Sequence, residues 1–206
     1  MPHDHSHDEH SHALLPSDPA LRVKALETVL TRKGLIDPEA IDVLIDQFEN
    51  RVGPQHGAKV VARAWSDPEF KARLLKDASD ASREMGFDVG PMHLIAVENT
   101  DDTHNVIVCT LCSCYPRNLL GLPPDWYKSR AYRSRTVKEP RKVLAEFGVT
   151  LPESTKIRVH DSTADMRYVV IPARPSGTEQ LSETELAALV TRDSMIGTGL
   201  ARAPSA

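Results

Sequence analysis

Apolar residues recur with helical spacing along the first third of the chain. Ile41, Leu44, Ile45 and Phe48 follow the i, i+3, i+4, i+7 pattern of one helical face. Helix starts and stops are marked by prolines, capping aspartates and glycines. These signals predict four helices, beginning after residue 17, near 37, near 57 and after 67, with stops at 34 and 53–54.

After Gly86 the pattern changes to short apolar runs typical of β-strands. Residues 94–97 and 106–108 flank a polar turn, and a second pair, 157–159 and 168–171, flanks residues 161–163. Helical turns are predicted for 123–135, and a helix for 139–147. Ser182 and Glu185 form a capping box that predicts a last helix running to about Asp193. Strand pairs flanked by helices indicate an α/β fold.

The composition predicts one main domain with an appendage. Of 206 residues, 40% are hydrophobic and 26% charged, as in ordinary globular proteins. Residues 1–16 contain five histidines and almost no apolar residue, which predicts a disordered tail with weak affinity for divalent metal. We divide the chain into this tail, a helical N-terminal arm (17–56), a metal-binding catalytic core (57–200) and a flexible C-terminus (201–206).

Net charge and hydropathy exclude two classes of partner. The net charge of −4 gives no reason to expect a nucleic-acid partner. The basic stretch around Arg130, Arg133 and Arg135 favours a partner interface or a solvated face over a nucleic-acid site. No apolar run approaches the roughly 20 residues of a membrane span. Without a secretory signal pattern, we expect a cytoplasmic protein.

The three cysteines of the chain lie within six residues. Cys109 ends a predicted strand, and Cys112 and Cys114 complete a C-x-x-C-x-C spacing. Such clustering does not suit a disulfide framework. If the backbone folds back, three thiolates can bind one ion, and the peptide nitrogens between the last two cysteines come close to it.

The spacing of the cysteines alone leaves alternatives to a three-thiolate metal site open. A structural zinc site needs four ligands, and only His104, on the preceding strand, could add one. A thioredoxin-like motif would open a helix, which the third cysteine and Tyr115-Pro116 do not favour. Three unrelated buried cysteines are the remaining alternative, together with a non-enzymatic metal carrier that also uses the histidine tail.

The segment from Val108 to Pro116 resembles the metal-binding motif of nitrile hydratase α subunits. The resemblance covers about residues 20 to 197, and it is carried by further segments at 52–54, 57–61, 64–70, 97–100, 120–127, 132–135, 139–141 and 190–197. It implies a helical arm followed by a layered α-β-β-α core with mixed sheets.

The resemblance also implies a cofactor and an activity, the hydration of a nitrile to an amide. One non-corrin Co(III) ion, or less favoured Fe(III), is held by the sulfurs of Cys109, Cys112 and Cys114 and by the backbone nitrogens of Ser113 and Cys114. Cys112 is expected as sulfinic acid and Cys114 as sulfenic acid, which makes Cys112, Ser113 and Cys114 the catalytic candidates. Thr110, where iron-type relatives carry serine, favours cobalt.

Partners follow from the resemblance too. A separate β subunit, in one chain or split into two, supplies arginines to the oxidised sulfurs, which implies a heterodimer or heterotetramer. An activator that inserts cobalt is also implied. Within this chain, Thr110, Asp161 and Arg167 are candidates for supporting the cysteine segment. For Asp161 and Arg167, a charge on a surface turn and an ion pair at a strand end are equally good explanations.

Three departures from the family bear on the substrate. Arg117 and His160 stand where tryptophans are usual, and Gly90 stands where many relatives have a glutamine that lines the pocket. Arg117, with Trp126, is a candidate for the substrate pocket. A cation there would favour a polar or anionic substrate, such as the nucleoside nitrile of toyocamycin nitrile hydratase or the anion used by the related thiocyanate hydrolase γ subunit.

Overall fold

The computed structural model describes residues 18–46 and 54–204, and the chain divides into two compact units, Met1–Ile45 and Asp46–Ala206. The predicted histidine-rich tail and Phe48 lie outside the described residues. In the N-terminal segment, helix α1 spans Asp18–Arg32 and α2 spans Pro38–Asp46. The chain leaves α1 through Gly34, whose φ of 66° is a left-handed conformation that suits glycine after a helix.

Three helices open the second unit: α3 (Gln55–Ser66), α4 (Pro68–Lys76) and α5 (Ala78–Glu84). The Asp67 carboxylate accepts hydrogen bonds from the backbone N–H groups of Glu69 and Phe70, both at 3.0 Å, and so caps α4 as predicted. Asp77 caps α5 in the same way, although the sequence pattern did not single out that short helix. Phe70 is buried on the inner face of α4.

Four strands form two ladders of two: β1 (His93–Glu98) pairs with β4 (Met166–Ile171), and β2 (Thr103–Val108) pairs with β3 (Lys156–Asp161). All four runs of apolar residues are therefore strands, as predicted. The expected mixed sheets are wrong, because both pairings are parallel. Strands that are neighbours in sequence lie in different ladders, and the long connection from residue 109 to 155 makes parallel pairing possible.

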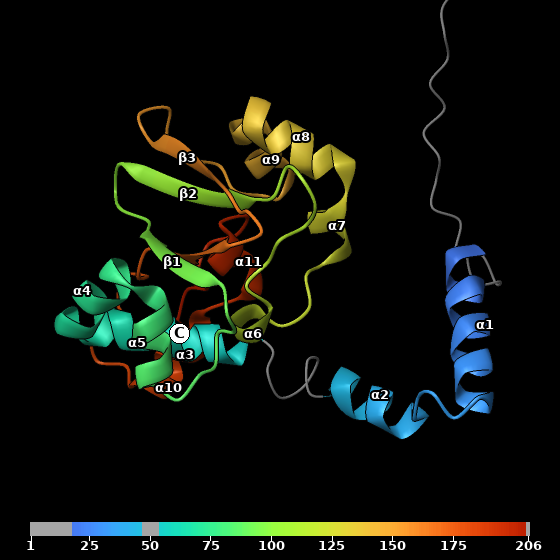
Figure 1. Ribbon diagram of the computed structural model, residues 1–206. Helices are drawn as coiled ribbons and strands as arrows, with labels where there is room; N and C mark the ends of the chain where they lie inside the picture. The colour runs from blue at the N-terminus through green and yellow to red at the C-terminus, as the bar shows by residue number, and fades with distance from the viewer. Residues whose placement is uncertain (1–17, 47–53, 205–206) are drawn as a thin grey trace, which may run out of the picture. The chain divides into compact units, whose positions relative to one another are not determined.

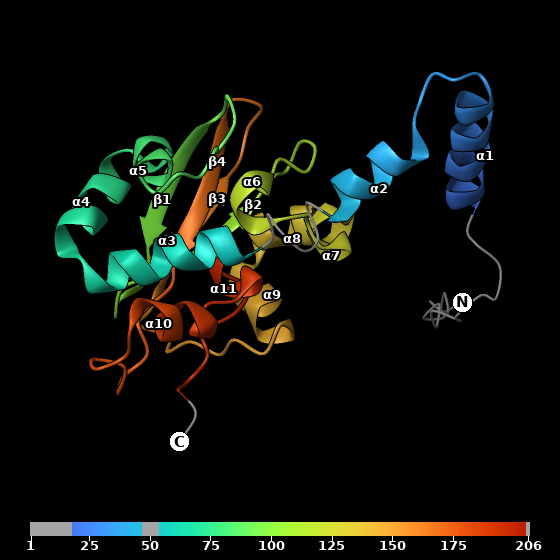
Figure 2. The ribbon, with the colours of Figure 1, turned by 90° about the horizontal axis from the view of Figure 1, so that it is seen from below.

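The layers follow the order α-β-β-α, which confirms the expected fold class. Helices α4 and α5 pack on β1, β2 contacts β4, and α8 (Arg130–Lys138) and α9 (Pro140–Glu146) pack on β2 and β3 (Figure 1). Helix α3 crosses below this assembly against α6 (Arg117–Leu120) and α10 (Glu183–Leu189) (Figure 2). A further short helix, α7, spans Asp125–Lys128.

The predicted last helix is in fact two. The capping box of Ser182 and Glu185 is present and starts α10, but α10 ends at Leu189 rather than at Asp193. Thr191 then caps a separate helix, α11 (Arg192–Ile196), which contacts β4. Tertiary packing explains the break, because Met195 and Ile196 of α11 are completely buried. Among the described helices, none is long and apolar enough to cross a membrane.

Candidate metal centre

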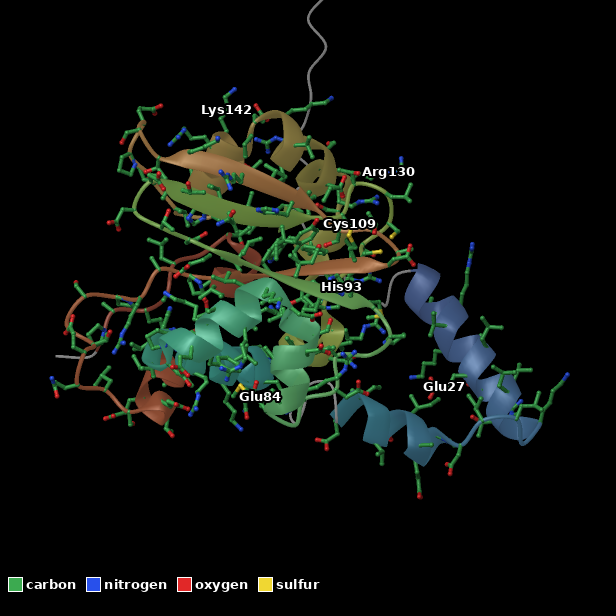
Figure 3. The ribbon with its side chains drawn as sticks, turned by 60° about the vertical axis from the view of Figure 1, so that its left-hand side comes forward. Glu27, Glu84, His93, Cys109, Arg130 and Lys142 are labelled. Carbon is green, nitrogen blue, oxygen red and sulfur yellow. The ribbon has the colours of Figure 1, made fainter. Side chains whose placement is uncertain are left out.

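The cysteine segment begins where strand β2 ends. Val108 is buried and its carbonyl accepts a hydrogen bond from the Ser162 N–H, at 2.7 Å, which continues the pairing with β3 by one residue. Cys109, labelled in Figure 3, follows at once and is fully buried. The Tyr132 hydroxyl donates to the Ile107 carbonyl at 2.6 Å and ties α8 to the same strand end. The first sulfur is thereby fixed by the core.

The backbone turns back after Cys109, and the three sulfurs converge. The Sγ atoms of Cys109 and Cys112 are 3.5 Å apart, and those of Cys112 and Cys114 are 2.9 Å apart. The Cys112 N–H points at the Cys109 sulfur, 3.3 Å away. Exposure rises along the loop, from the buried Cys109 to the exposed Cys112. We call residues 109–114 the claw.

Three neighbouring side chains hold the claw in this shape. Asp161, at the end of β3, accepts hydrogen bonds from the Thr110 N–H at 2.9 Å and from the Thr110 hydroxyl at 2.6 Å. Arg133 of α8 donates to the Cys112 carbonyl at 2.8 Å, and the Tyr127 hydroxyl donates to the Cys114 carbonyl at 2.8 Å. The Thr110 hydroxyl is therefore engaged by Asp161 rather than directed at the sulfurs.

The crowded thiols have divergent acidities. Hydrogen bonds, first of all from the Cys114 thiol, lower the pKa of Cys112 to about 7, so its thiolate is accessible at neutral pH. Burial raises the pKa of Cys114 to about 12, with the Cys112 contact adding to the increase and the nearby charge of Arg167 opposing it. A metal ion bound to the sulfurs would deprotonate all three.

The donor set fits a single transition-metal ion. All three sulfurs lie within 4.8 Å of one another, and two thiolates on one ion at metal–sulfur distances of about 2.3 Å can lie at most roughly 4.6 Å apart. Among the described residues, no histidine or carboxylate joins the three thiols as a fourth ligand. A structural zinc site with four side-chain ligands is therefore not formed by the described part of this chain.

A cleft of about 410 Å³ opens at the exposed side of the claw. It is lined by the claw residues Cys112, Ser113 and Cys114 together with Met92, Tyr115, Arg117, Asn118 and Arg167. Of the two candidate pocket residues, Arg117 therefore lies at the cleft. Trp126 lies elsewhere, in an aromatic cluster with Tyr127, Tyr132 and Phe147, and it does not line the cleft.

Arg167 of β4 approaches the claw but does not pair with Asp161. Its Nη1 donates to the carbonyls of Thr163 and Ala164, in the turn between β3 and β4, and to that of Met166, the first residue of β4. Its Nε is buried and lacks a hydrogen-bond partner among the described residues. The strand-end ion pair considered from the sequence is thus not formed with any described residue, and the guanidinium lies close enough to Cys114 to lower that thiol's pKa.

His104, the one candidate for a fourth metal ligand, is occupied by a buried polar network at the start of β2. Its Nε2 donates to the Gly197 carbonyl at 2.7 Å, which leaves Nδ1 to accept from the Asn99 amide at 3.2 Å. Asn99 in turn accepts from the Asn105 N–H at 2.7 Å. Burial lowers the pKa of His104, so the imidazole stays neutral. His104 is a structural histidine.

The sequence patterns did not assign a role at the site to Arg133, Tyr127, Met92 or Asn118. Arg133 belonged to a basic stretch interpreted as an interface or solvated face, and within that stretch Arg135 does pair with Glu139 and Glu146. A signal for Tyr127 and Arg133 was present, because both lie in segments that carry the family resemblance. Nothing in the local pattern marks Met92 or Asn118, which reach the cleft only through the fold.

Comparison with known proteins agrees with this geometry. The sequence matches the family "Nitrile hydratase, alpha chain" over residues 17–199. It is 58% identical to the low-molecular weight cobalt-containing nitrile hydratase subunit alpha of Rhodococcus rhodochrous, covering 90% of each chain. It is 41% identical to the thiocyanate hydrolase subunit gamma of Thiobacillus thioparus, covering 88% of this chain and 79% of that one.

The fold is shared with solved structures as well. A double mutant of the Fe-type nitrile hydratase from Comamonas testosteroni Ni1 superposes with a TM-score of 0.84 at 44% identity, over 92% of this chain and 94% of that one. The family match, the shared fold and the cysteine triad agree with one another. The chain belongs to the nitrile hydratase alpha-chain family and is an enzyme subunit, as its sequence motif predicts.

Proposed function

We propose that the chain hydrates nitriles to amides at a cobalt ion held by the claw. The observation that carries the proposal is the convergence of three thiols, at the exposed end of a buried strand, beside a cleft lined by two arginines. Cobalt is favoured over iron because the R. rhodochrous relative is described as cobalt-containing. The ligands would be the sulfurs of Cys109, Cys112 and Cys114 and the backbone nitrogens of Ser113 and Cys114.

Oxidation of two cysteines forms part of the proposal. Cys112, as sulfinic acid, and Cys114, as sulfenic acid, would add three oxygen atoms to the chain. Cys112 is exposed and its thiolate is accessible at neutral pH, which suits oxidation there. Cys114 lines the cleft, where an electron-rich sulfenate oxygen could act as nucleophile or base toward a bound nitrile.

When bound, trivalent cobalt supplies a Lewis acid that polarises the nitrile or lowers the pKa of bound water. The residues of the chain would position the claw and offset its charge. Asp161 fixes the claw through Thr110, Arg133 and Tyr127 hold the carbonyls of Cys112 and Cys114, and Arg167 offsets negative charge near Cys114. Cysteine oxyanions need such donors, since unpaired charge in a dry site is costly.

We further propose that the active site is completed by a β subunit and loaded by an activator protein. Only part of the claw is covered by this chain, with Leu111 at its tip 85% exposed. A large apolar side chain with that exposure suits a surface that a partner protein covers. The partner would contribute donors to the oxidised sulfurs, and the assembled α and β chains would be the active species.

The test is intact mass and metal analysis of the chain purified with its β subunit from cobalt-supplemented cells. We expect one cobalt per α chain and three added oxygen atoms that map to Cys112 and Cys114. A Cys112→Ser variant is the control, and it should lose both the metal and the added mass. Zinc with unmodified cysteines would contradict the proposal, and so would cobalt that exchanges freely with a chelator, as a metal carrier requires.

A further inference from the structure

The charge of Arg117 has no counterpart in the described part of the chain. Arg117 begins α6, three residues after Cys114, and its exposed side chain lines the cleft beside the claw. Among the described residues, its guanidinium makes no hydrogen bond and no ion pair, and no aspartate or glutamate lines the cleft. A free cation at the mouth of a cleft without carboxylates attracts and orients anions.

The second arginine of the cleft is committed elsewhere. The Arg167 Nη1 atom is shared among three backbone carbonyls, and the charge of its guanidinium acts on Cys114. Arg167 therefore serves the claw. Of the two arginines that line the cleft, Arg117 is the one whose guanidinium makes no hydrogen bond to any described residue, so its whole charge is available to a ligand.

The cleft that Arg117 lines has a volume of about 410 Å³, which is larger than the reacting C≡N group alone needs. Gly90 lies against two residues of the lining: a Cβ built on it would meet the Asn118 Nδ2 at 3.5 Å and the Met92 Cε at 3.6 Å. With φ of 77°, this position disfavours any residue with a side chain. A side chain is therefore disfavoured at a position that borders Met92 and Asn118, two residues of the cleft lining.

We propose that the enzyme prefers substrates in which the C≡N group belongs to an anion, and that Arg117 is the residue that binds the negative charge. The inference rests on the proposed function. In the reaction, water adds across C≡N, R–C≡N + H2O giving R–C(=O)NH2, with no change of net charge. The negative charge is a spectator that sets binding and orientation, so its effect falls on kcat/KM through KM.

The experiment compares two nitriles of nearly the same shape, 3-cyanopropanoate and 3-cyanopropanamide, with the cobalt-loaded complex of α and β subunits. Wild-type enzyme should favour the anion in kcat/KM. Arg117→Gln should lower kcat/KM for the anion about tenfold, a typical loss for one charge-assisted hydrogen bond, and change that for the neutral amide less than about twofold. Raising the ionic strength should also reduce the preference of the wild-type enzyme for the anion, because salt screens the charge of Arg117.

Two variants control for charge and for position. Arg117→Lys keeps the cation and should restore most of the preference. Lys76→Gln removes one positive charge from an exposed position of α4, outside the cleft lining, and should leave the preference unchanged. Equal effects of Arg117→Gln and Lys76→Gln would overturn the inference, because net charge alone would then explain the result.

The remaining outcomes separate the inference from the proposed function. Turnover of 3-cyanopropanamide without preference for the anion overturns the role of Arg117 and leaves nitrile hydration standing. Failure of the cobalt-loaded complex to hydrate either compound overturns the proposed function itself. Thiocyanate is a third substrate in the same assay. If its consumption depends on Arg117, Arg117 selects anions, and the preferred substrate is a small inorganic anion rather than a nitrile that carries a carboxylate.

Discussion

Strand β2 carries polar groups at both ends, and the two ends differ in how those groups are satisfied. At its start, His104 and Asn105 are buried and bonded to Asn99 and Gly197. At its end, Cys109 opens a loop whose other cysteines reach the surface. There, the buried Nε atoms of Arg133 and Arg167 have no hydrogen-bond partner among the described residues.

This difference separates polar groups that stabilise the fold from polar groups that can bind a ligand. Buried polar groups that find all their partners within the chain make a fold specific and leave nothing for a ligand. Polar groups that converge on a cleft without saturating one another are those that a metal, a substrate or a partner subunit can engage. Substitutions at the start of β2 should therefore affect stability, and those at its end should affect activity.

The largest effect on activity is expected for Cys114→Ser. Serine keeps the shape of the side chain but removes a soft thiolate and the site of the sulfenate, so turnover in the α–β complex should fall by at least about 1000-fold. Stability should change little in the metal-free chain, because Cys114 is only half buried. Lys76→Gln, at an exposed position of α4 outside the cleft lining, is the control and should keep wild-type turnover. A Cys114→Ser enzyme with more than a tenth of wild-type turnover would contradict its assigned role.

Among substitutions in the polar network at the start of β2, the largest effect on stability is expected for Gly197→Ala. Gly197 has φ of 91°, and a Cβ would lie 2.0 Å from the Asn105 carbonyl oxygen. The free energy of unfolding should fall by about 3–5 kcal/mol, because both the backbone and the buried network must move. Gly177→Ala is matched in φ, 76°, but has open space around it and should cost about 1 kcal/mol. Urea unfolding of both variants measures the difference, and equal losses would argue against the tight packing at Gly197.

An intermediate effect is expected for Asp161→Asn, which retains one of the two acceptor oxygens that hold Thr110. We expect about a tenfold loss of kcat, corresponding to roughly 1.4 kcal/mol, with KM little changed, because the claw is less firmly held in the transition state. Asp165→Asn, at an exposed position of the turn that follows β3, is the matched control. A loss of the same size in both variants would show that the turn, and not the contact with Thr110, is responsible.

The smallest effect concerns the protonation of His104. Burial lowers its pKa in the folded state, so the unfolded chain takes up a proton first as the pH falls. The stability that neutral His104 contributes is present above its unfolded pKa of about 6.5 and is lost as the pH falls toward its folded pKa. Uptake of one proton on unfolding can change the free energy of unfolding by at most about 1.4 kcal/mol per pH unit.

Urea unfolding at pH 7 and pH 5 of the wild type and of His104→Gln isolates this contribution. Burial lowers the pKa of His160 as well, so only the difference between the two proteins reports on His104. The variant should be less stable at both pH values and should lose less stability between them. Parallel pH dependence in the two proteins would show that His104 does not titrate on unfolding.

The sequence by itself determined the local elements and the chemistry of the claw. Helical periodicity, the cap at Asp67 and the four apolar runs are signals within a few residues, and the claw is one contiguous segment, so each could be recognised without the fold. The segments that resemble the nitrile hydratase family then supplied the layered fold class, which no local pattern contains.

The tertiary structure decided which strands pair and what surrounds the sulfurs. Parallel ladders join residues more than 50 positions apart, such as Val108 with Asp161, and no local pattern encodes such a partner. The same pairing brings Asp161 to Thr110, while α8 and β4 bring Arg133 and Arg167 to the claw. The end of α10 at Leu189 was decided in the same way, by the burial of Met195 and Ile196 in the core. Local propensities fix elements, whereas the contacts that complete a site depend on burial summed over the whole chain.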